Sequence, residues 1–297
     1  MSRLNEFQEM HHFLSSQKNV FLNFGAVENA AAPALEQVYL YNIIRELQKW
    51  PRFNDFRFYL VTANAPHDFL FDNSCVVFYL SNEDHQIPEN ILKAKLVCSP
   101  YCPTSGAAAN CLPIPLGYNG SVESLPYKPV DERPFYIFFS GNLHRRRLWF
   151  FFHARFYLLL NSVKSFFSNS GVIDKIQFTR KFTGGLSPTE YAQVLMDSKI
   201  ACVPEGYKSD ISFRFFEAAK SGNVIITKTL YDFWFFKDFP GIQLSSWRKL
   251  HRTLRWLDTN PSKLKEISQR MLNYYETKCA EPAVAQKVIE VLMFGKK

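Results

Sequence analysis

The chain has 297 residues, of which 47% are hydrophobic and 21% charged, a composition that excludes disordered, collagen-like and coiled-coil proteins. Its formal net charge is +8, an excess that favours anionic partners such as nucleic acid, a membrane surface or phosphorylated substrates, or that serves solubility alone. Aromatic residues make up 16%, with 29 phenylalanines, so the chain is expected to fold around large, aromatic-rich cores in two domains or one large one.

Strand and helix patterns alternate through the first half of the chain. An apolar run at 20–24, closed by Gly25, predicts a buried strand, and apolar residues at helical spacing follow between Pro33 and Leu47. Because strands that alternate with helices pair in parallel, this half predicts an α/β fold. Further strands are expected at 56–61, 75–80, 96–98 and 112–117.

A polar, proline-rich segment at 119–134 interrupts the pattern and is typical of a linker. We therefore expect one α/β domain over residues 1–130 and another over residues 131–297, with the last helix packing back on the first domain. Two such domains predict a cleft between them. Ligands of open parallel sheets bind at the carboxyl ends of the strands, and the search for chemistry concentrates there.

The second half repeats the alternation of strands and helices. Ser187-Pro188-Thr189-Glu190 is a capping box with proline in the first turn, which predicts the start of a helix. Gly222 is typical of the end of another helix. The expected strands lie at 135–139, 175–182, 200–203 and 224–227, and the expected helices at 145–163, 188–197, 212–221, 247–257, 262–275 and 284–294.

The loop 204–210 carries the clearest chemical signal, because it joins the end of a strand to the start of a helix. Backbone N–H groups and the helix dipole favour an anion at such a start. On the helix, Arg214 and Glu217 share a face, so that a guanidinium can hold a phosphate while a carboxylate accepts hydrogen bonds from a ribose diol. The same spacing suits a surface ion pair on a capped helix, and spacing alone leaves both interpretations open.

Three stretches of this region fit one known pattern: Lys199-Ile200-Ala201-Cys202-Val203-Pro204-Glu205-Gly206, Ser212-x-Arg214-x-x-Glu217-Ala218 and Ser221-Gly222-x-Val224-Ile225. The pattern resembles the exostosin-type glycosyltransferases, and more broadly the nucleotide-sugar domain of glycosyltransferases with the GT-B fold. The resemblance implies that Glu217 binds the donor ribose. It also implies that Arg214 and Ser209 lie near the diphosphate, where Arg214 assists catalysis.

Two other stretches support the resemblance. Residues 114–118 look like the end of the N-terminal domain in that family, and residues 138–147 look like the first strand and phosphate loop of its C-terminal domain. Gly141 permits close approach of the backbone, and the arginines at 145–147 bring positive charge to a helix start. Arg180-Lys181, at the end of another strand, would add positive charge to the same cleft. The alternative for the arginines at 145–147 is a solvated helix start, and the alternative for Arg180-Lys181 is an exposed strand end. The donor-binding residues expected are Gly141, Asn142, Arg145, Lys181, Glu205, Ser209, Ser212, Arg214 and Glu217.

The sequence contains no Asp-x-Asp triplet, which speaks against the metal-dependent glycosyltransferase fold, so neither a metal nor another cofactor is expected. An inverting transfer needs a base that deprotonates the acceptor hydroxyl, and loops after N-terminal strands would supply it. Glu28 is the first candidate for this catalytic base. A retaining mechanism needs no such base. The other candidates are His67, Asp68, Glu83, Asp84 and His85.

Together the motifs and the resemblance predict an α/β protein of the GT-B type, with two Rossmann-like domains facing a cleft. The first domain would take the acceptor and the second the donor. The protein would move a sugar from a nucleotide sugar, with UDP favoured, to a glycan or lipid-linked acceptor in polysaccharide biosynthesis, by inversion and without a metal. The alternative is a non-catalytic glycan- or nucleotide-binding protein of the same fold. Nucleic acid is not expected as a partner, because arginine and lysine are dispersed through the α/β pattern.

The N-terminus shows no apolar segment of a secretory signal, and the apolar stretch 148–160 is interrupted by His153 and Arg155. We therefore expect a cytoplasmic protein with a buried helix in this stretch. The six cysteines are expected to be buried thiols, with a metal site over 98–111 as the alternative. The net charge favours salt-sensitive, peripheral association of the N-terminal domain with an anionic membrane. The alternative is that this charge serves only the binding of donor phosphates and solubility. The candidates for this contact are Lys49, Arg52 and Arg57.

Overall fold

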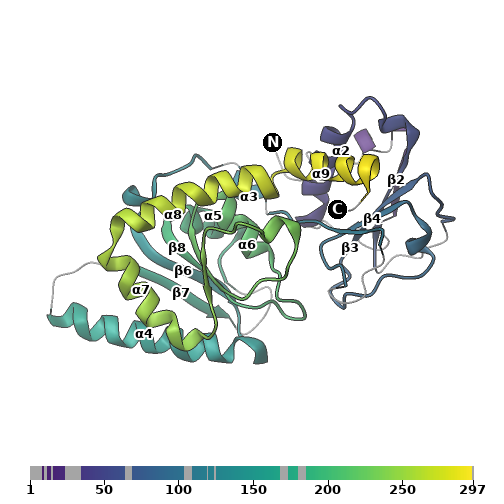
Figure 1. Cartoon of the computed structure of the whole chain (residues 1–297). Helices are drawn as coiled ribbons and strands as arrows, with labels where there is room; N and C mark the ends of the chain where they lie inside the picture. The colour runs from purple at the N-terminus through teal and green to yellow at the C-terminus, as the bar shows by residue number, and fades with distance from the viewer. Residues whose placement is uncertain are drawn as a thin grey trace. The chain divides into compact units, whose positions relative to one another are not determined.

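The computed structural model describes two compact units (Figure 1). The first unit comprises Met1–Gly117, Phe233–Phe235 and Lys278–Lys297, and the second comprises Tyr118–Asp232 and Phe236–Thr277. The division thus falls after Gly117, ahead of the boundary expected at 130, and the last helix belongs to the first unit. The residues described are 9, 12–14, 16–23, 35–63, 69–103, 109–118, 120–123, 125–167, 173–179 and 185–295.

The first unit is built on a five-stranded parallel sheet of order β1-β2-β3-β4-β5. Its central strand β3 is buried at every position, as a parallel sheet covered on both faces requires. Helix α2 packs against α9, and the Tyr39 hydroxyl of α2 donates a hydrogen bond to the Cys279 carbonyl. The elements are β1 (Val20–Asn23), α2 (Leu35–Leu47), β2 (Arg57–Thr62), β3 (Cys75–Leu80), β4 (Leu96–Ser99), β5 (Cys111–Pro113) and α9 (Glu281–Phe294).

The second unit holds another five-stranded parallel sheet, with the order β10-β9-β8-β6-β7. Its strands are β6 (Phe135–Asn142), β7 (Ile173–Thr179), β8 (Ser198–Val203), β9 (Val224–Lys228) and β10 (Ile242–Leu244). Its helices are α3 (Gly120–Glu123), α4 (Leu148–Phe167), α5 (Pro188–Met196), α6 (Phe213–Lys220), α7 (Leu250–Thr259) and α8 (Pro261–Tyr274).

Helices cover both faces of this second sheet. In the strand order β10-β9-β8-β6-β7, the connection from β6 through α4 leads to β7, at one edge of the sheet. The connections through α5 to β8 and through α6 to β9 lead in the opposite direction, toward the other edge. Right-handed crossovers therefore put α4 on one face and α5 and α6 on the opposite face. The side chains of β6 agree, because Phe139 packs on Phe150 of α4, whereas its neighbour Phe138 meets Tyr191 of α5, with ring centroids 5.3 Å apart.

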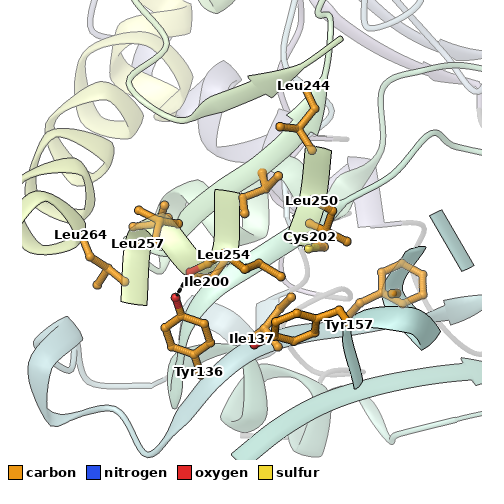
Figure 2. Close-up of a cluster of buried hydrophobic side chains, with 14 of the residues drawn as sticks. Tyr136, Ile137, Tyr157, Ile200, Cys202, Leu244, Leu250, Leu254, Leu257 and Leu264 are labelled. Atoms are coloured by element: carbon orange, nitrogen blue, oxygen red, sulfur yellow. Dashed lines mark hydrogen bonds between the residues drawn. The ribbon is translucent and has the colours of Figure 1, made fainter. Parts of the chain in front are cut away.

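Helix α7 completes the core on the α4 face. Figure 2 shows Leu250, Leu254 and Leu257 of α7 packed in one cluster with Ile200 of β8. The Tyr136 hydroxyl donates a hydrogen bond of 2.6 Å to the Leu254 carbonyl, so the buried phenol has its polar atom satisfied.

The segment 119–134, expected as a linker, is built into the second unit through Arg133. This arginine is 2% exposed, and its guanidinium donates hydrogen bonds to the carbonyls of Lys128 at 2.8 Å, Ser198 at 2.9 Å and Ser221 at 2.6 Å. The segment is therefore tied to the first residue of β8 and to the end of α6 by buried, charge-assisted hydrogen bonds.

The helix ends follow their local signals. In the capping box that starts α5, Ser187 Oγ accepts from the Glu190 N–H at 3.3 Å and the Glu190 carboxylate accepts from the Ser187 N–H at 2.8 Å, which confirms that prediction. Gly222 follows the end of α6 with φ +67°, a conformation that favours glycine. Strand β10 was not expected, because three residues are too few to show a period.

Helix α4 buries only one face, although the sequence predicted a buried helix. Phe150 and Ala154 are fully buried, whereas Trp149 is 60% exposed and Phe152 is 58% exposed. Within the described ranges, no helix combines the length and the hydrophobicity that crossing a membrane requires. All six cysteines are buried, as expected.

The core of the second unit makes a first prediction. Replacing fully buried Leu254 with alanine (Leu254→Ala) should lower the free energy of unfolding by about 2–5 kcal/mol, from lost transfer energy and the cavity left behind. A urea titration followed by circular dichroism measures this change. The matched control is Leu159→Ala, whose leucine is 62% exposed and should change the unfolding free energy by less than about 0.5 kcal/mol. Equal effects of the two variants would contradict the packing described.

Candidate functional site

The candidate site lies at the carboxyl end of β6 in the second unit, where two arginines from different elements converge. Arg147 precedes α4, and Arg214 lies in the first turn of α6. Both guanidinium carbons lie 5.8 Å from the ring centroid of Phe139. A Cβ atom added to Gly141 would lie 2.7 Å from Nη2 of Arg214 and 3.2 Å from Nη1 of Arg147. The missing side chain at Gly141 thus makes room for both positive groups.

Arg147 is almost completely buried, with 2% of its surface exposed. Its Nε donates to the Glu205 carbonyl at 2.7 Å, and its Nη1 donates to the carbonyl and the side-chain oxygen of Asn142 at 3.0 Å. Burial, followed by repulsion from Arg214, lowers the pKa of Arg147 to about 9. The group therefore stays charged at neutral pH, at a cost that an anionic ligand would offset.

Arg214 is held by the same strand. Its Nε donates a hydrogen bond of 2.8 Å to the Ser140 carbonyl, which leaves its terminal nitrogens directed at the space above Gly141. Within the described part of the chain, no carboxylate forms an ion pair with Arg147 or Arg214. Buried or half-buried guanidinium groups without a carboxylate are the arrangement expected of an anion site.

The nearby carboxylates are engaged elsewhere. Glu205 pairs with Lys228 at 3.0 Å and accepts a hydrogen bond of 3.3 Å from Trp247 Nε1. Asp210 forms an ion pair with exposed Arg146.

Glu217 lies one turn after Arg214 on α6 and is 4% exposed. It shares a hydrogen bond with Tyr191 of α5, whose pKa is raised by burial and by the Glu217 charge. The phenol therefore stays protonated and donates to the carboxylate, which fixes the direction of the acceptor oxygens.

The start of α6 adds unused hydrogen-bonding groups. Ser212 occupies the N-cap position with extended backbone, yet its hydroxyl does not cap the helix. Its Oγ is buried and has no partner among the described residues. A buried hydroxyl without a partner is costly, so its position beside Arg214 at a helix start points to a missing acceptor. Ser209 Oγ, in contrast, is used within the loop, where it accepts from the Ile211 N–H at 3.1 Å.

An imidazole and an exposed phenol lie beside the arginines. His144 makes an edge-to-face contact with Tyr207, with centroids 5.5 Å apart, and Tyr207 is 66% exposed. Burial and the neighbouring Arg147 and Arg146 lower the pKa of His144 to about 4, so this histidine is neutral at pH 7. Its buried Nε2 has no partner among the described residues and is available to a ligand.

The structure brings most of the expected donor-site residues together and moves others away. Arg214 is one of the two guanidinium groups, and Gly141, Asn142 and the Glu205 carbonyl contact the pair. Ser212 lies two residues before Arg214, at the start of α6. The carboxylate of Glu205 and the hydroxyl of Ser209 serve contacts within the protein. Arg145 is exposed and makes no ion pair in the described chain; Arg147 takes the buried place instead, because it lies three residues before buried Phe150. That helical spacing was the signal available in the sequence.

The remaining expected residues divide by location. Glu28, His67, Asp68, Arg180 and Lys181 lie outside the described residues. Asp84 accepts a hydrogen bond from the Gln86 N–H at 3.2 Å, and His85 Nδ1 lies 3.2 Å from the Cys102 carbonyl, so both serve the turn after β3; Glu83 is exposed there. Sequence reasoning missed His144, Tyr191 and Lys228. These residues contribute to the site through tertiary contacts with Tyr207, Glu217 and Glu205, which no local sequence pattern predicts. Among the described residues, no three His, Cys, Asp or Glu side chains gather as metal ligands do.

Comparison with known proteins gives matches in structure only. No family model matches the chain, and no curated protein matches it by sequence. HepE from Anabaena, solved with UDP and glucose, matches with a TM-score of 0.53 at 10% identity, over 92% of this chain and 98% of that one. Its complex with UDP-glucose gives a TM-score of 0.51 at 10% identity, with the same coverage. A glycosyltransferase from Rickettsia africae gives 0.48 at 12% identity, over 86% of this chain and 80% of that one.

The two HepE structures, whose TM-scores exceed 0.5, each match over 92% of a chain that holds two five-stranded parallel sheets. The fold is therefore the two-domain α/β fold of GT-B glycosyltransferases, which confirms the prediction of two α/β domains with parallel sheets.

The guanidinium pair predicts binding of a diphosphate. Arg214→Gln should weaken binding of inorganic pyrophosphate about ten- to a hundredfold, because hydrogen bonds to charged groups contribute about 1.5–3 kcal/mol each. Isothermal titration calorimetry measures the affinity. Arg270→Gln is the control, since this arginine of α8 is exposed and pairs only with Glu266 at 3.6 Å. Pyrophosphate affinity that is the same in both variants would remove Arg214 from the site.

Gly141 makes a separate prediction. Gly141→Ala should displace the Arg214 guanidinium, because the new methyl group would lie 2.7 Å from Nη2, and pyrophosphate affinity should fall. In the Arg214→Gln background the same substitution should have a much smaller effect, since the clashing group is gone. A double-mutant cycle by calorimetry measures this coupling. Additive losses would show that Gly141 acts independently of Arg214.

Proposed function

We propose that the protein is a glycosyltransferase that binds a nucleotide sugar, with UDP as the favoured nucleotide, at the carboxyl end of β6. The observation that carries the proposal is the pair Arg147 and Arg214, which lack carboxylate partners in the described chain and share the ring of Phe139. The unsatisfied hydroxyl of Ser212 lies two residues before Arg214, at the start of α6. This arrangement occurs in a fold shared with HepE, whose solved complexes hold UDP and UDP-glucose.

The donor's diphosphate is proposed to lie above Gly141. Its oxygens would accept hydrogen bonds from Arg214, from the Ser212 hydroxyl and from the backbone at the start of α6. Arg147 is more deeply buried and its hydrogen bonds already run to backbone carbonyls, so its contribution is charge more than direct contact.

The ribose is proposed to meet Glu217, one turn along the same helix. An ionised carboxylate only accepts hydrogen bonds, and a ribose diol offers two donors. Tyr191 holds that carboxylate in place and takes up part of its hydrogen-bonding capacity. Tyr207, exposed at the rim beside His144, offers an aromatic surface for the base.

The reaction would transfer the sugar with heterolysis of its bond to the diphosphate. An oxygen of the glycan or lipid-linked acceptor bonds to the anomeric carbon as the bond to the β-phosphate oxygen breaks, and the nucleoside diphosphate leaves with the electron pair. The acceptor proton passes to a base, for which Glu28 stays the candidate in an inverting reaction. The positive groups at β6 and α6 stabilise the negative charge that develops on the leaving group, a role that needs no metal.

Glu217 distinguishes nucleotide binding from simple anion binding. Glu217→Gln should weaken UDP binding about tenfold or more while leaving pyrophosphate affinity unchanged, because only the ribose contact is lost. Arg214→Gln should weaken both. Glu281→Gln, at a glutamate of the first unit that is 9% exposed, is the control for substitution of a buried carboxylate. Pyrophosphate affinity that falls together with UDP affinity would place Glu217 in a structural role.

Turnover tests the function itself. A panel of nucleotide sugars is screened by thermal shift, because a ligand that binds only the folded state raises the melting temperature. Release of the nucleoside diphosphate is then followed with glycan and lipid-linked acceptors, with and without excess chelator. The proposal expects turnover that survives the chelator and falls in Arg214→Gln. Tight donor binding without any turnover favours the non-catalytic binding protein, and rescue of a chelated enzyme by manganese or magnesium overturns the metal-independent mechanism.

A further inference from the structure

A stripe of apolar side chains is exposed along α4, on the side opposite the core. Trp149, Phe152, Phe156 and Leu159 recur at helical spacing and are 60%, 58%, 52% and 62% exposed. The opposite side of the same helix is buried against the sheet by Phe150, Ala154 and Tyr157. A helix that is apolar on both sides has one side without a partner in the monomer, and contiguous apolar surface of this kind marks an interaction site.

The stripe borders a groove formed with α7. A cavity of about 550 Å³ lies between the two helices, lined by Trp149, Phe152, His153, Phe156, Arg248, His251 and Arg252. The Arg248 guanidinium lies over the Trp149 ring, 5.4 Å from its centroid. We refer to Trp149, Phe152, Phe156, Leu159, Arg248 and Arg252 as the α4–α7 patch.

The charge around this patch is of one sign. Helix α4 contains no aspartate or glutamate, and between Trp247 and Thr259 the only acidic residue is Asp258. The exposed cations Arg155, Arg248, Lys249, Arg252 and Arg255 form no ion pair with described residues.

The cations expected to meet a membrane in the first unit are placed differently. Lys49 pairs with Glu46 at 2.6 Å, Arg52 with Asp55 at 2.8 Å, and Arg57 with Asp72 at 2.6 Å. Each positive charge is thus cancelled by a carboxylate beside it, and these residues do not present a positive surface. We therefore expect the α4–α7 patch, and not these three residues, to make the membrane contact.

We propose that the α4–α7 patch docks on the surface of an anionic lipid bilayer. An apolar helix face of tryptophan, phenylalanine and leucine, flanked by arginine and lysine, suits the boundary between headgroups and acyl chains. Tryptophan favours the headgroup level, and an arginine stacked on it can bind lipid phosphate bidentately. The inference is independent of the proposed transferase activity, since it uses none of the donor-site residues.

Charge and side-chain type favour a bilayer over other occupants. A second copy paired through the same patch would place like charges against one another, which disfavours association. Aromatic rings stack on the bases of a nucleic acid, but Leu159 gains nothing from such stacking, whereas acyl chains accommodate leucine and phenylalanine alike.

Vesicle binding tests the proposal. The full chain is sedimented with phosphatidylserine-containing vesicles and with pure phosphatidylcholine vesicles, at low and at high salt. We expect binding to the anionic vesicles that weakens with salt. The triple variant Trp149→Ser, Phe152→Ser, Phe156→Ser should bind at least about tenfold more weakly, because the loss of its apolar contact reduces partitioning. The matched control is Leu70→Ser, Met293→Ser, Phe294→Ser, whose side chains are 90%, 47% and 69% exposed in the first unit and which should bind like the unmodified chain.

The charge is tested in the same assay. Arg248→Gln with Arg252→Gln should weaken anionic-vesicle binding and flatten its salt dependence, whereas Lys93→Gln with Lys95→Gln removes the same charge from the first unit and should change little. Circular dichroism of every variant reports whether the chain is folded. Pyrophosphate titration reports separately whether the proposed donor site is intact, so that a failed donor site and a failed patch are distinguished.

Several outcomes would overturn the proposal. These are no sedimentation with anionic vesicles at low salt, equal binding by the patch variant and its control, or a dimer in analytical ultracentrifugation that the triple variant abolishes. Binding of an oligonucleotide that depends on the patch, without vesicle binding, would reassign the patch to nucleic acid.

Discussion

Arg147 and Arg214 bring two positive charges to one end of β6, with both guanidinium carbons 5.8 Å from the ring centroid of Phe139. Like charges this close repel, and burial of Arg147 adds a desolvation cost that shows in its pKa of about 9. Hydrogen bonds to backbone carbonyls offset part of this desolvation cost, but a carbonyl carries only a partial negative charge. The neighbouring structure follows from this constraint: Gly141 must lack a side chain, and the loop after β8 must turn the Glu205 carbonyl toward Arg147. A bound diphosphate would supply the negative charge that no described carboxylate provides to these two arginines.

The parts of the fold that local sequence controls were predictable. The capping box at Ser187 and the glycine at 222 define helix ends through contacts within a few residues, and the structure agrees with both. The parts that depend on distant contacts were not. Arg133 lies in a segment whose composition resembles a linker, yet it is buried by carbonyls 65 and 88 residues further along the chain. A tertiary contact also determines which of the three consecutive arginines enters the site. Arg147 lies on the same side of the chain as Phe150, which is buried in the core, whereas Arg145 and Arg146 are exposed.

Helix α4 shows why hydrophobicity alone did not predict its environment. An apolar helix is either buried on all sides or exposed on one of them, and both cases look alike in a sequence without a clear polar face. The strand order decides between them. It places α4 alone among the crossover helices on its face of the sheet, joined there by α7, so one side of α4 stays uncovered within the second unit.

The net charge of the chain is therefore used unevenly. Exposed ion pairs such as those of Lys49 and Arg57 add little to stability, but each places a carboxylate next to the positive charge of its partner. In the second unit, Arg147, Arg214 and the arginines of the α4–α7 patch form no ion pair with the described residues. The two groups are adjacent in the sequence, because the arginine segment 145–147 leads directly into α4. A bilayer bound to the exposed side of α4 would lie close to the start of that helix, where Arg147 reaches the proposed diphosphate site. Such a location would favour the proposed transfer to a lipid-linked acceptor.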